Sequence, residues 1–183
     1  MGPFFYLLFL LSCHSLSISA APPVAPPKLG EACNNVGGWY ITSQVCHSVL
    51  DTDPQSQTAD LNGIAIIAVN IATRNATLVL TDIKRFLQAT SDPIQQKALQ
   101  TCVQVYTDII PKLKVAAESI KSNKYSEAGT VLDVALGVPA KCDDVTANYP
   151  TVRALVDRDD VSFSNVVSVA RAVAGYLANY YSG

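Results

Sequence analysis

The sequence predicts an all-α protein: an up-down-up-down four-helix bundle preceded by an N-terminal helical hairpin and held by two disulfides. Apolar residues recur at steps of three and four over long segments, which is typical of amphipathic helices. No run of strand length alternates between apolar and polar residues. Four cysteines follow a leader that is typical of exported proteins, and secreted chains use cysteines mainly for disulfides.

The first residues of the chain predict a signal peptide over 1–20. An apolar run at 4–11 is followed by small and polar residues, which is the layout of a cleaved leader. The run is shorter than the roughly 20 apolar residues that a membrane-spanning helix needs. We expect cleavage near Ala20 or Ala21, which also removes Cys13.

The mature chain is expected to be one domain with a short tail and no membrane segment. Residues 21–27 form a Pro-rich stub, and proline favours an extended, solvated backbone. The remaining residues, 28–183, have the length of a single domain. Within it we expect the helical hairpin at 28–50, turning near Gly37 and Gly38, and the bundle at 55–181.

The four bundle helices are predicted from their periodicity and their end signals. The first is expected over 58–89, on an apolar stripe that includes Leu78. Asp92 as a cap and Pro93 at the first helical position start the second helix, which runs to the polar turn at 121–123. The third and fourth helices are expected over the ranges 124–136 and 160–180.

The segment between the last two helices is expected to be irregular. Gly137 and Pro139 form an ordinary helix stop. A loop through Asp143 and Asp144 is then expected to lead to the fourth helix. Aspartates 157, 159 and 160 stand before that helix, where negative charge is favourable.

Composition and motifs favour a binding protein over an enzyme. The net charge is −2, from 13 basic and 15 acidic residues, so the chain lacks the basic surface typical of nucleic-acid binders. His47 is the sole histidine outside the leader, and it adjoins Cys46, which is expected to be in a disulfide, so a surface or hairpin role is expected for it rather than catalysis. The chain has no Cys-x-x-Cys pair and no glycine-rich phosphate loop. We therefore expect no cofactor, no metal site and no catalytic residues.

The four mature cysteines, Cys33, Cys46, Cys102 and Cys142, imply two disulfides with three possible pairings. The simplest arrangement is a short clamp within the hairpin and a longer clamp between bundle helices. A second candidate modification is an N-glycosylation acceptor at Asn75. Asn75 falls on the core-facing stripe of the first helix, so it is expected to be poorly accessible.

The chain resembles the plant invertase and pectin methylesterase inhibitors from about Cys33 to Leu177. The similarity lies in the order and spacing of four segments: 53–61 (Asp-Pro-Gln-Ser-Gln-Thr-Ala-Asp-Leu), 97–108, 125–132 and 141–144. This resemblance implies a helical hairpin before a four-helix bundle, with Cys33 bonded to Cys46 and Cys102 bonded to Cys142. Segment 53–61 looks most like the branch named "putative invertase inhibitors".

The resemblance also implies a function and a contact site. It implies a secreted inhibitor that occludes the active site of a cell-wall or vacuolar acid invertase in a one-to-one complex, located in the apoplast or cell wall, with the vacuole as an alternative. Pectin methylesterase is the alternative target, and a non-inhibitory helical module that binds an apolar ligand is a further alternative. Invertase-directed members carry Pro-Lys-Phe before the third bundle helix. The matching residues here, Asn123, Lys124 and Tyr125, are the predicted target-binding residues, although the proline is absent.

Overall fold

The computed structural model describes residues 28–36 and 41–181, without the side chains of residues 151–152 and 154–161. The predicted signal peptide and Pro-rich stub lie outside the described residues. The predicted glycine turn of the hairpin lies outside them as well.

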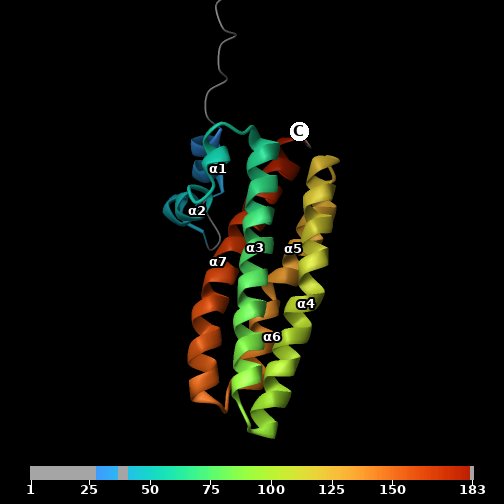
Figure 1. Cartoon of the computed structure of the whole chain (residues 1–183). Helices are drawn as coiled ribbons and strands as arrows, with labels where there is room; N and C mark the ends of the chain where they lie inside the picture. Colours follow the sequence, from blue (N-terminus) through green and yellow to red (C-terminus); the bar gives the residue numbers. More distant parts are fainter. Residues whose placement is uncertain (1–27, 37–40, 182–183) are drawn as a thin grey trace, which may run out of the picture.

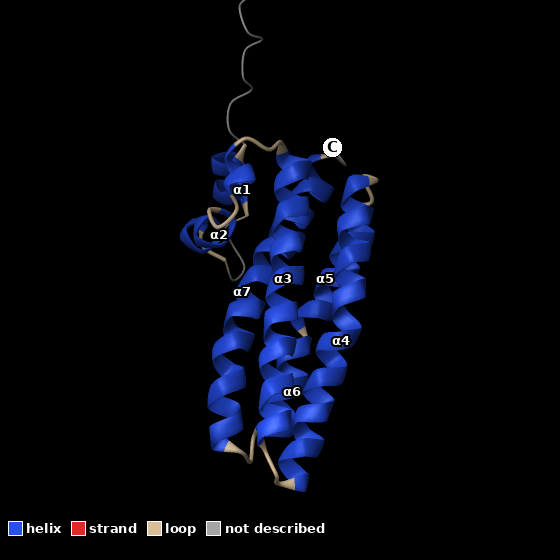
Figure 2. Ribbon diagram, viewed as in Figure 1, coloured by secondary structure: helices blue, strands red, loops and turns tan. Residues whose placement is uncertain are grey.

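All regular elements of the described residues are helical (Figure 2). The elements are α1 (Leu29–Asn35), α2 (Ser43–Leu50), a 3-10 turn (Pro54–Gln57), α3 (Leu61–Ala89), α4 (Pro93–Lys121), α5 (Tyr125–Leu136), α6 (Val138–Thr146) and α7 (Pro150–Tyr180). The predicted all-α class is confirmed.

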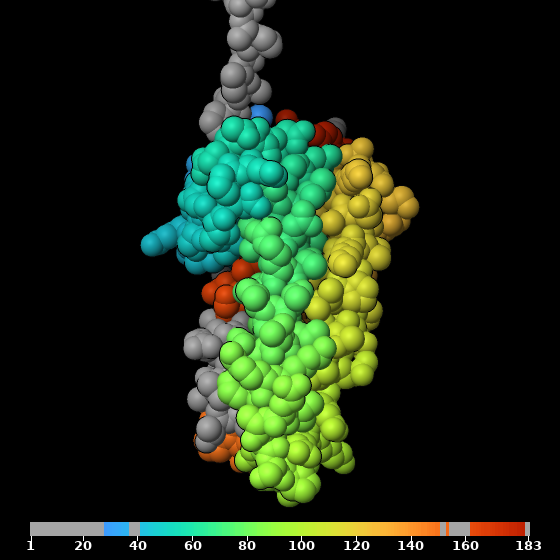
Figure 3. Space-filling view, viewed as in Figure 1, coloured from blue at the N-terminus to red at the C-terminus, as the bar shows by residue number. Residues whose placement is uncertain are grey.

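The long helices form a closed ring. α3 packs on α4 and α7, and α5 also packs on α4 and α7, while α6 continues the third side of the bundle between α4 and α7 (Figure 1). Successive sides run in opposite directions, as predicted. At one end of the bundle lie the first residues of α3 and α5 and the last residues of α4 and α7. We call this end the head of the bundle. The hairpin of α1 and α2 lies beside α3 near this end (Figure 1 and Figure 3).

Short-range capping explains where the first two bundle helices begin. The Asp92 carboxylate accepts hydrogen bonds from the backbone N–H of Ile94 (2.8 Å) and Gln95 (3.4 Å), so α4 begins where predicted. α3 begins three residues later than predicted, because the Asp60 carboxylate caps it by accepting from the Gly63 N–H at 2.7 Å. The residues before Asp60 instead form the 3-10 turn.

The predicted loop between the third and fourth helices is wrong. Residues 138–146 form α6, with Pro139 in its first turn, where a missing N–H costs no helical hydrogen bond. α7 begins at Pro150 for the same reason, not at Asp160. The aspartates at 157, 159 and 160 therefore lie inside α7 rather than ahead of it. Pro139, which was expected to mark the end of a helix, lies instead at the beginning of the next one.

The core is a continuous apolar interior between the four sides of the bundle. Tyr106 of α4 and Phe163 of α7 are fully buried and meet edge to face with ring centroids 5.3 Å apart. One predicted core residue is misplaced, since Leu78 is 64% exposed. The neighbouring Val79 is buried, and successive helical side chains are about 100° apart, so only one of the two can face the core.

α3 is also long and apolar enough to cross a membrane by length and composition alone. Its most apolar 18-residue window has a mean hydropathy of 1.5, and 56% of that window is buried inside the bundle. A core helix of a bundle has this same composition, so the apolar character of α3 is accounted for by its packing.

Both disulfides have the pairing that the family resemblance implied. Cys33 of α1 is bonded to Cys46 of α2, and Cys102 of α4 is bonded to Cys142 of α6, with Cα–Cα distances of 5.4 and 4.9 Å. All four cysteines are buried. The first bond closes the hairpin, and the second joins two sides of the bundle.

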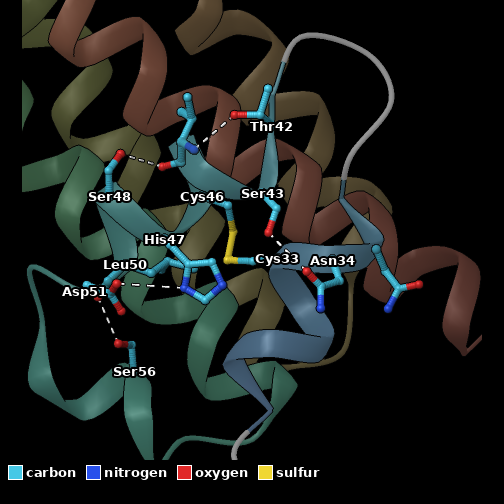
Figure 4. Close-up of a disulfide and its surroundings, with 12 residues drawn as sticks. Cys33, Asn34, Thr42, Ser43, Cys46, His47, Ser48, Leu50, Asp51 and Ser56 are labelled. Atoms are coloured by element: carbon cyan, nitrogen blue, oxygen red, sulfur yellow. Dashed lines mark hydrogen bonds and ion pairs between the residues drawn. A yellow bond between two sulfur atoms is a disulfide. The ribbon is translucent and has the colours of Figure 1, made fainter.

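Polar contacts hold the hairpin in shape around its disulfide (Figure 4). The Val45 N–H donates to Thr42 Oγ1 at 3.2 Å, which caps α2, and Ser43 Oγ donates to Asn34 Oδ1 at 3.1 Å, which ties α2 to α1. His47 lies on the outer side of α2 with Nδ1 3.8 Å from Asp51 Oδ2.

Candidate functional site

The turn that joins α4 to α5 at the head of the bundle has a defined backbone. The Asn123 N–H donates to the Ile120 carbonyl at 2.9 Å, and the Lys124 N–H donates to the Ser119 carbonyl at 2.8 Å. This pair of bonds is the Schellman arrangement, which needs a left-handed residue just beyond the helix. Asn123 supplies it with φ 59°, a conformation that asparagine tolerates better than most residues.

The Asn123 side chain ties this turn to two helices. Its Oδ1 accepts hydrogen bonds from Asn62 Nδ2 at 3.0 Å and from the Tyr125 hydroxyl at 2.8 Å. Asn62 lies in the first turn of α3, so the contact joins residues that are 61 positions apart. The turn is therefore fixed by tertiary contacts as well as by its own backbone bonds.

Lys124 projects from this fixed turn into solvent. Its side chain is 59% exposed, and its Nζ lies 3.4 Å from Glu127 Oε1 in the first turn of α5. Exposed ion pairs of this kind contribute little to stability, so a partner's carboxylate can replace Glu127 without a large penalty. The backbone of Lys124 is held at the same time, because its carbonyl accepts the first helical bond of α5 from Ala128 at 3.1 Å.

Tyr125 faces the opposite way and supports the turn from within. Its ring is only 7% exposed and stacks on Tyr181, with ring centroids 5.6 Å apart and planes 14° apart. Burial raises the pKa of its hydroxyl above the ordinary tyrosine value. Of the three predicted target-binding residues, Lys124 thus presents an exposed side chain, whereas Asn123 and Tyr125 hold the turn in place.

Two grooves flank Lys124. One, of 360 Å³, lies between α4 and α5, and the other, of 760 Å³, lies between α5 and the end of α7. Lys124 and Glu127 line both grooves and therefore form the ridge between them. The walls of the smaller groove include Lys114 and Val115 of α4, and the walls of the larger groove include Tyr181.

The segment that carries this ridge is positively charged. Residues 112–127 contain four lysines and two glutamates, in a chain whose overall net charge is −2. Charge of one sign on one surface favours a partner surface of the opposite sign. The exposed lysine of the α4–α5 turn is therefore suited to a carboxylate of a partner.

The other candidate residues from the sequence lie away from this site. Asn75 is half-buried in the middle of α3, and its Nδ2 donates to Ser162 Oγ of α7 at 3.2 Å. That contact occupies the side-chain nitrogen to which a glycan would be attached. Poor accessibility of Asn75 to glycosylation stays a prediction. Within 28–36 and 41–181, no cluster of three or more histidine, cysteine, aspartate or glutamate residues could hold a metal ion.

Comparison with known proteins assigns the chain and its fold to a family. The model of the plant invertase/pectin methylesterase inhibitor family matches residues 29–173. The chain belongs to this family. The resemblance seen in the sequence is thereby confirmed, and so is the family's inhibitor role at the level that the two target classes share.

The relatives of this family member divide between those two classes. The chain is 28% identical over 137 residues to a "Putative invertase inhibitor" of Platanus acerifolia, covering 75% of this chain and 76% of that protein. It is 27% identical over 142 residues to the cell wall / vacuolar inhibitor of fructosidase 2 of Arabidopsis thaliana, covering 77% of each. It is 22% identical over 133 residues to a pectinesterase inhibitor of Actinidia deliciosa, covering 73% of this chain and 72% of that one.

A solved structure supports the fold independently. A crystal structure of a mutant form of a pectin methylesterase inhibitor from Arabidopsis aligns with a TM-score of 0.67 at 20% identity. The alignment covers 81% of this chain and 95% of that chain. At this identity the likeness concerns the arrangement of the helices alone.

Sequence reasoning did not anticipate two members of the site. Asn62 follows an ordinary helix cap, and Tyr181 follows the last turn of α7. Neither position belongs to a motif, and each reaches the α4–α5 turn only because the bundle brings three helix ends together. The pattern at 123–125 could identify the turn but not its supports.

Proposed function

We propose that this family member is a secreted inhibitor of an acid invertase that blocks the enzyme's active site in a one-to-one complex, with Lys124 as the central contact. The observation that carries the proposal is the exposed lysine on a rigid turn within a lysine-rich segment. The relatives from Platanus and Arabidopsis named for invertase or fructosidase inhibition support the choice of enzyme.

Charge gives the physical basis for this choice. A retaining glycosidase holds two carboxyl groups about 5–5.5 Å apart in its active site. An ammonium group placed between them would replace its weak contact with Glu127 by stronger contacts in a site without water. Because the turn is already ordered, little conformational entropy is lost on binding.

Pectin methylesterase is the second candidate target. The pectinesterase inhibitor of Actinidia deliciosa and the solved Arabidopsis structure support it. An apolar-ligand carrier is less favoured, because bulky side chains such as Tyr106 and Phe163 fill the space between the helices.

The test is a paired inhibition assay of the mature protein against one acid invertase and one plant pectin methylesterase. We expect inhibition of the invertase, and we expect Lys124→Ala to raise the inhibition constant about 30-fold, which corresponds to about 2 kcal/mol for the loss of a hot spot. Lys97→Ala is the matched control and should leave inhibition unchanged, since Lys97 is also an exposed lysine but lies near the start of α4, at the other end of the bundle. Equal inhibition constants for Lys124→Ala and the parent protein would refute the role of Lys124.

A further inference from the structure

We infer that Asn62, in the first turn of α3, is a positioning residue of the inhibitory surface: it holds the turn that presents Lys124 and adds little to the stability of the fold. The inference rests on the proposed function, because it concerns the same turn. It extends that function to a residue of another helix, which acts through Lys124 and not by touching the target enzyme.

The backbone that carries Asn62 is fixed. Its neighbour Leu61 is only 5% exposed, and Ile64 is fully buried. The Asp60 carboxylate closes the first turn of α3 by accepting from the Gly63 N–H at 2.7 Å. The Asn62 side chain therefore extends from a helix end that is held both by the core and by a cap.

Asn62 acts on the residue that sets the direction of the turn. Its Nδ2 donates to Asn123 Oδ1 at 3.0 Å, and Asn123 has the φ of 59° on which the α4–α5 turn depends. A left-handed backbone is unfavourable for a residue with a Cβ, so contacts to its side chain help to keep it in this one geometry. Lys124 follows directly in the chain, so its direction depends on that geometry.

The other amide atom of Asn62 opposes folding. Its Oδ1 is buried and has no hydrogen-bond partner in the part of the chain that the structure describes. A buried polar atom without a partner is unfavourable, and asparagine is also a poorer helix former than alanine. One bond made and one atom left unsatisfied leave little net stabilisation. Exceptions of this kind are typical of functional sites.

Loss of the Asn62 bond should loosen the turn without leaving a new unsatisfied atom. Asn123 Oδ1 would keep its second bond, from the Tyr125 hydroxyl at 2.8 Å. The turn would then adopt the binding geometry in a smaller fraction of the molecules. The apparent affinity for a partner falls in proportion to that fraction.

The first experiment measures inhibition constants against the enzyme that the parent protein inhibits. We expect Asn62→Ala to raise the inhibition constant about fivefold, as for the loss of one neutral hydrogen bond. Asn62→Asp keeps the size of the side chain but has no donor, and it should raise the constant at least as much. Asn70→Ala is the matched control and should leave inhibition unchanged, because Asn70 is an exposed asparagine of the same helix.

Two further readouts separate positioning from a merely structural role. In a Lys124→Ala background, Asn62→Ala should change the inhibition constant by less than about twofold, because its effect passes through that lysine. The urea midpoint of Asn62→Ala should equal or exceed that of the parent protein. A structural residue would instead lower the midpoint and weaken inhibition equally in both backgrounds.

A measurement on the free protein tests the turn itself. The Lys124 N–H donates to the Ser119 carbonyl at 2.8 Å, and this bond should protect it from hydrogen exchange. We expect this amide to exchange faster in Asn62→Ala than in the parent protein or in Asn70→Ala. An unchanged exchange rate would overturn the inference.

The outcomes separate the inference from the proposed function. If Lys124→Ala weakens inhibition and Asn62→Ala does not, or if Asn62→Ala lowers the urea midpoint, the proposed function stands and the positioning role is overturned. If Lys124→Ala has no effect, or if the parent protein inhibits neither enzyme, the proposed contact fails and the inference fails with it.

Discussion

Replacing Cys102 and Cys142 together with alanine is expected to lower the free energy of unfolding by about 4 kcal/mol. Both residues are fully buried, and their bond joins α4 to α6 at a Cα–Cα distance of 4.9 Å. Alanine leaves no unpaired polar group in the core, so the main change is the loss of the crosslink itself.

The magnitude follows from the length of chain that the bond closes. The sequence separation is 40, and the chain-entropy model gives about 4 kcal/mol for a loop of that size. Cys33 and Cys46 are separated by 13 residues, for which the same model gives about 3 kcal/mol. Domains of this kind are stable by roughly 5–15 kcal/mol in total, so the longer crosslink is a large fraction of the whole.

Urea unfolding followed by far-UV circular dichroism measures the difference. With a slope of about 2 kcal/mol per molar urea, the midpoint of Cys102→Ala/Cys142→Ala should fall by about 2 M. The matched control is Cys33→Ala/Cys46→Ala, which should lose less, because its loop is shorter and lies in the hairpin beside the bundle.

Two results would refute this reasoning. A loss below about 1 kcal/mol with an unchanged slope would mean that the loop is already restricted in the unfolded chain. A larger loss for the hairpin pair than for the bundle pair would mean that loop length does not rank the two crosslinks.

Three further predictions concern the core, a helix cap and acid stability. Phe163→Ala should reduce the free energy of unfolding by about 3–5 kcal/mol, because it empties the fully buried site beside Tyr106; thermal or urea unfolding measures it, and a loss below about 1 kcal/mol would contradict tight packing there. Asp92→Ala should cost about 1 kcal/mol by removing the cap of α4, whereas Asp92→Asn should retain most of it. The hydrogen bond from Lys28 Nζ lowers the pKa of the Glu31 carboxyl below its ordinary value. Because the unfolded chain binds this proton more readily than the folded protein, the Lys28–Glu31 pair contributes to the free energy of unfolding. This stabilising contribution is fully present above pH 4.5 and is lost as the pH falls through the lowered pKa of Glu31. Glu31→Gln should flatten that acid limb in unfolding measured from pH 6 to pH 2, and an unchanged limb would exclude the pair as its cause.

Sequence reasoning located the parts of the fold that depend on local interactions. The start of α4 followed from Asp92 and Pro93, because capping and the fixed φ of proline act within one helical turn. The apolar stripes of α3, α4 and α7 followed from apolar residues at steps of three and four, because an α-helix places residues with this spacing on one face. These features are set by residues within a few positions of one another.

The same reasoning failed where a local pattern has two solutions. Pro139 and Pro150 are compatible with the end of one helix and with the first turn of the next, and the bundle uses the second solution. Leu78 and Val79 both fit an apolar stripe, and packing against α4 and α7 decides that Val79 is buried.

The site shows the same division. The motif at 123–125 pointed to Lys124 through a family resemblance, and the fold places that lysine on an exposed ridge. The burial of Tyr125 and the exposure of Tyr181 could not be inferred from the motif. They depend on how the ends of α5 and α7 meet.

The amino-acid order alone determined the helical class, since periodicity and capping are properties of neighbouring residues. The pairing of the cysteines and the importance of the turn that carries the lysine followed from the family resemblance of the sequence. Only the packed bundle decided that Asn62 and Tyr181 support that turn, because they reach it from helices that are distant along the chain. Hydrogen bonds and ring stacking act over a few ångströms, and the number of residues between two positions in the sequence does not tell how close they lie in the folded protein.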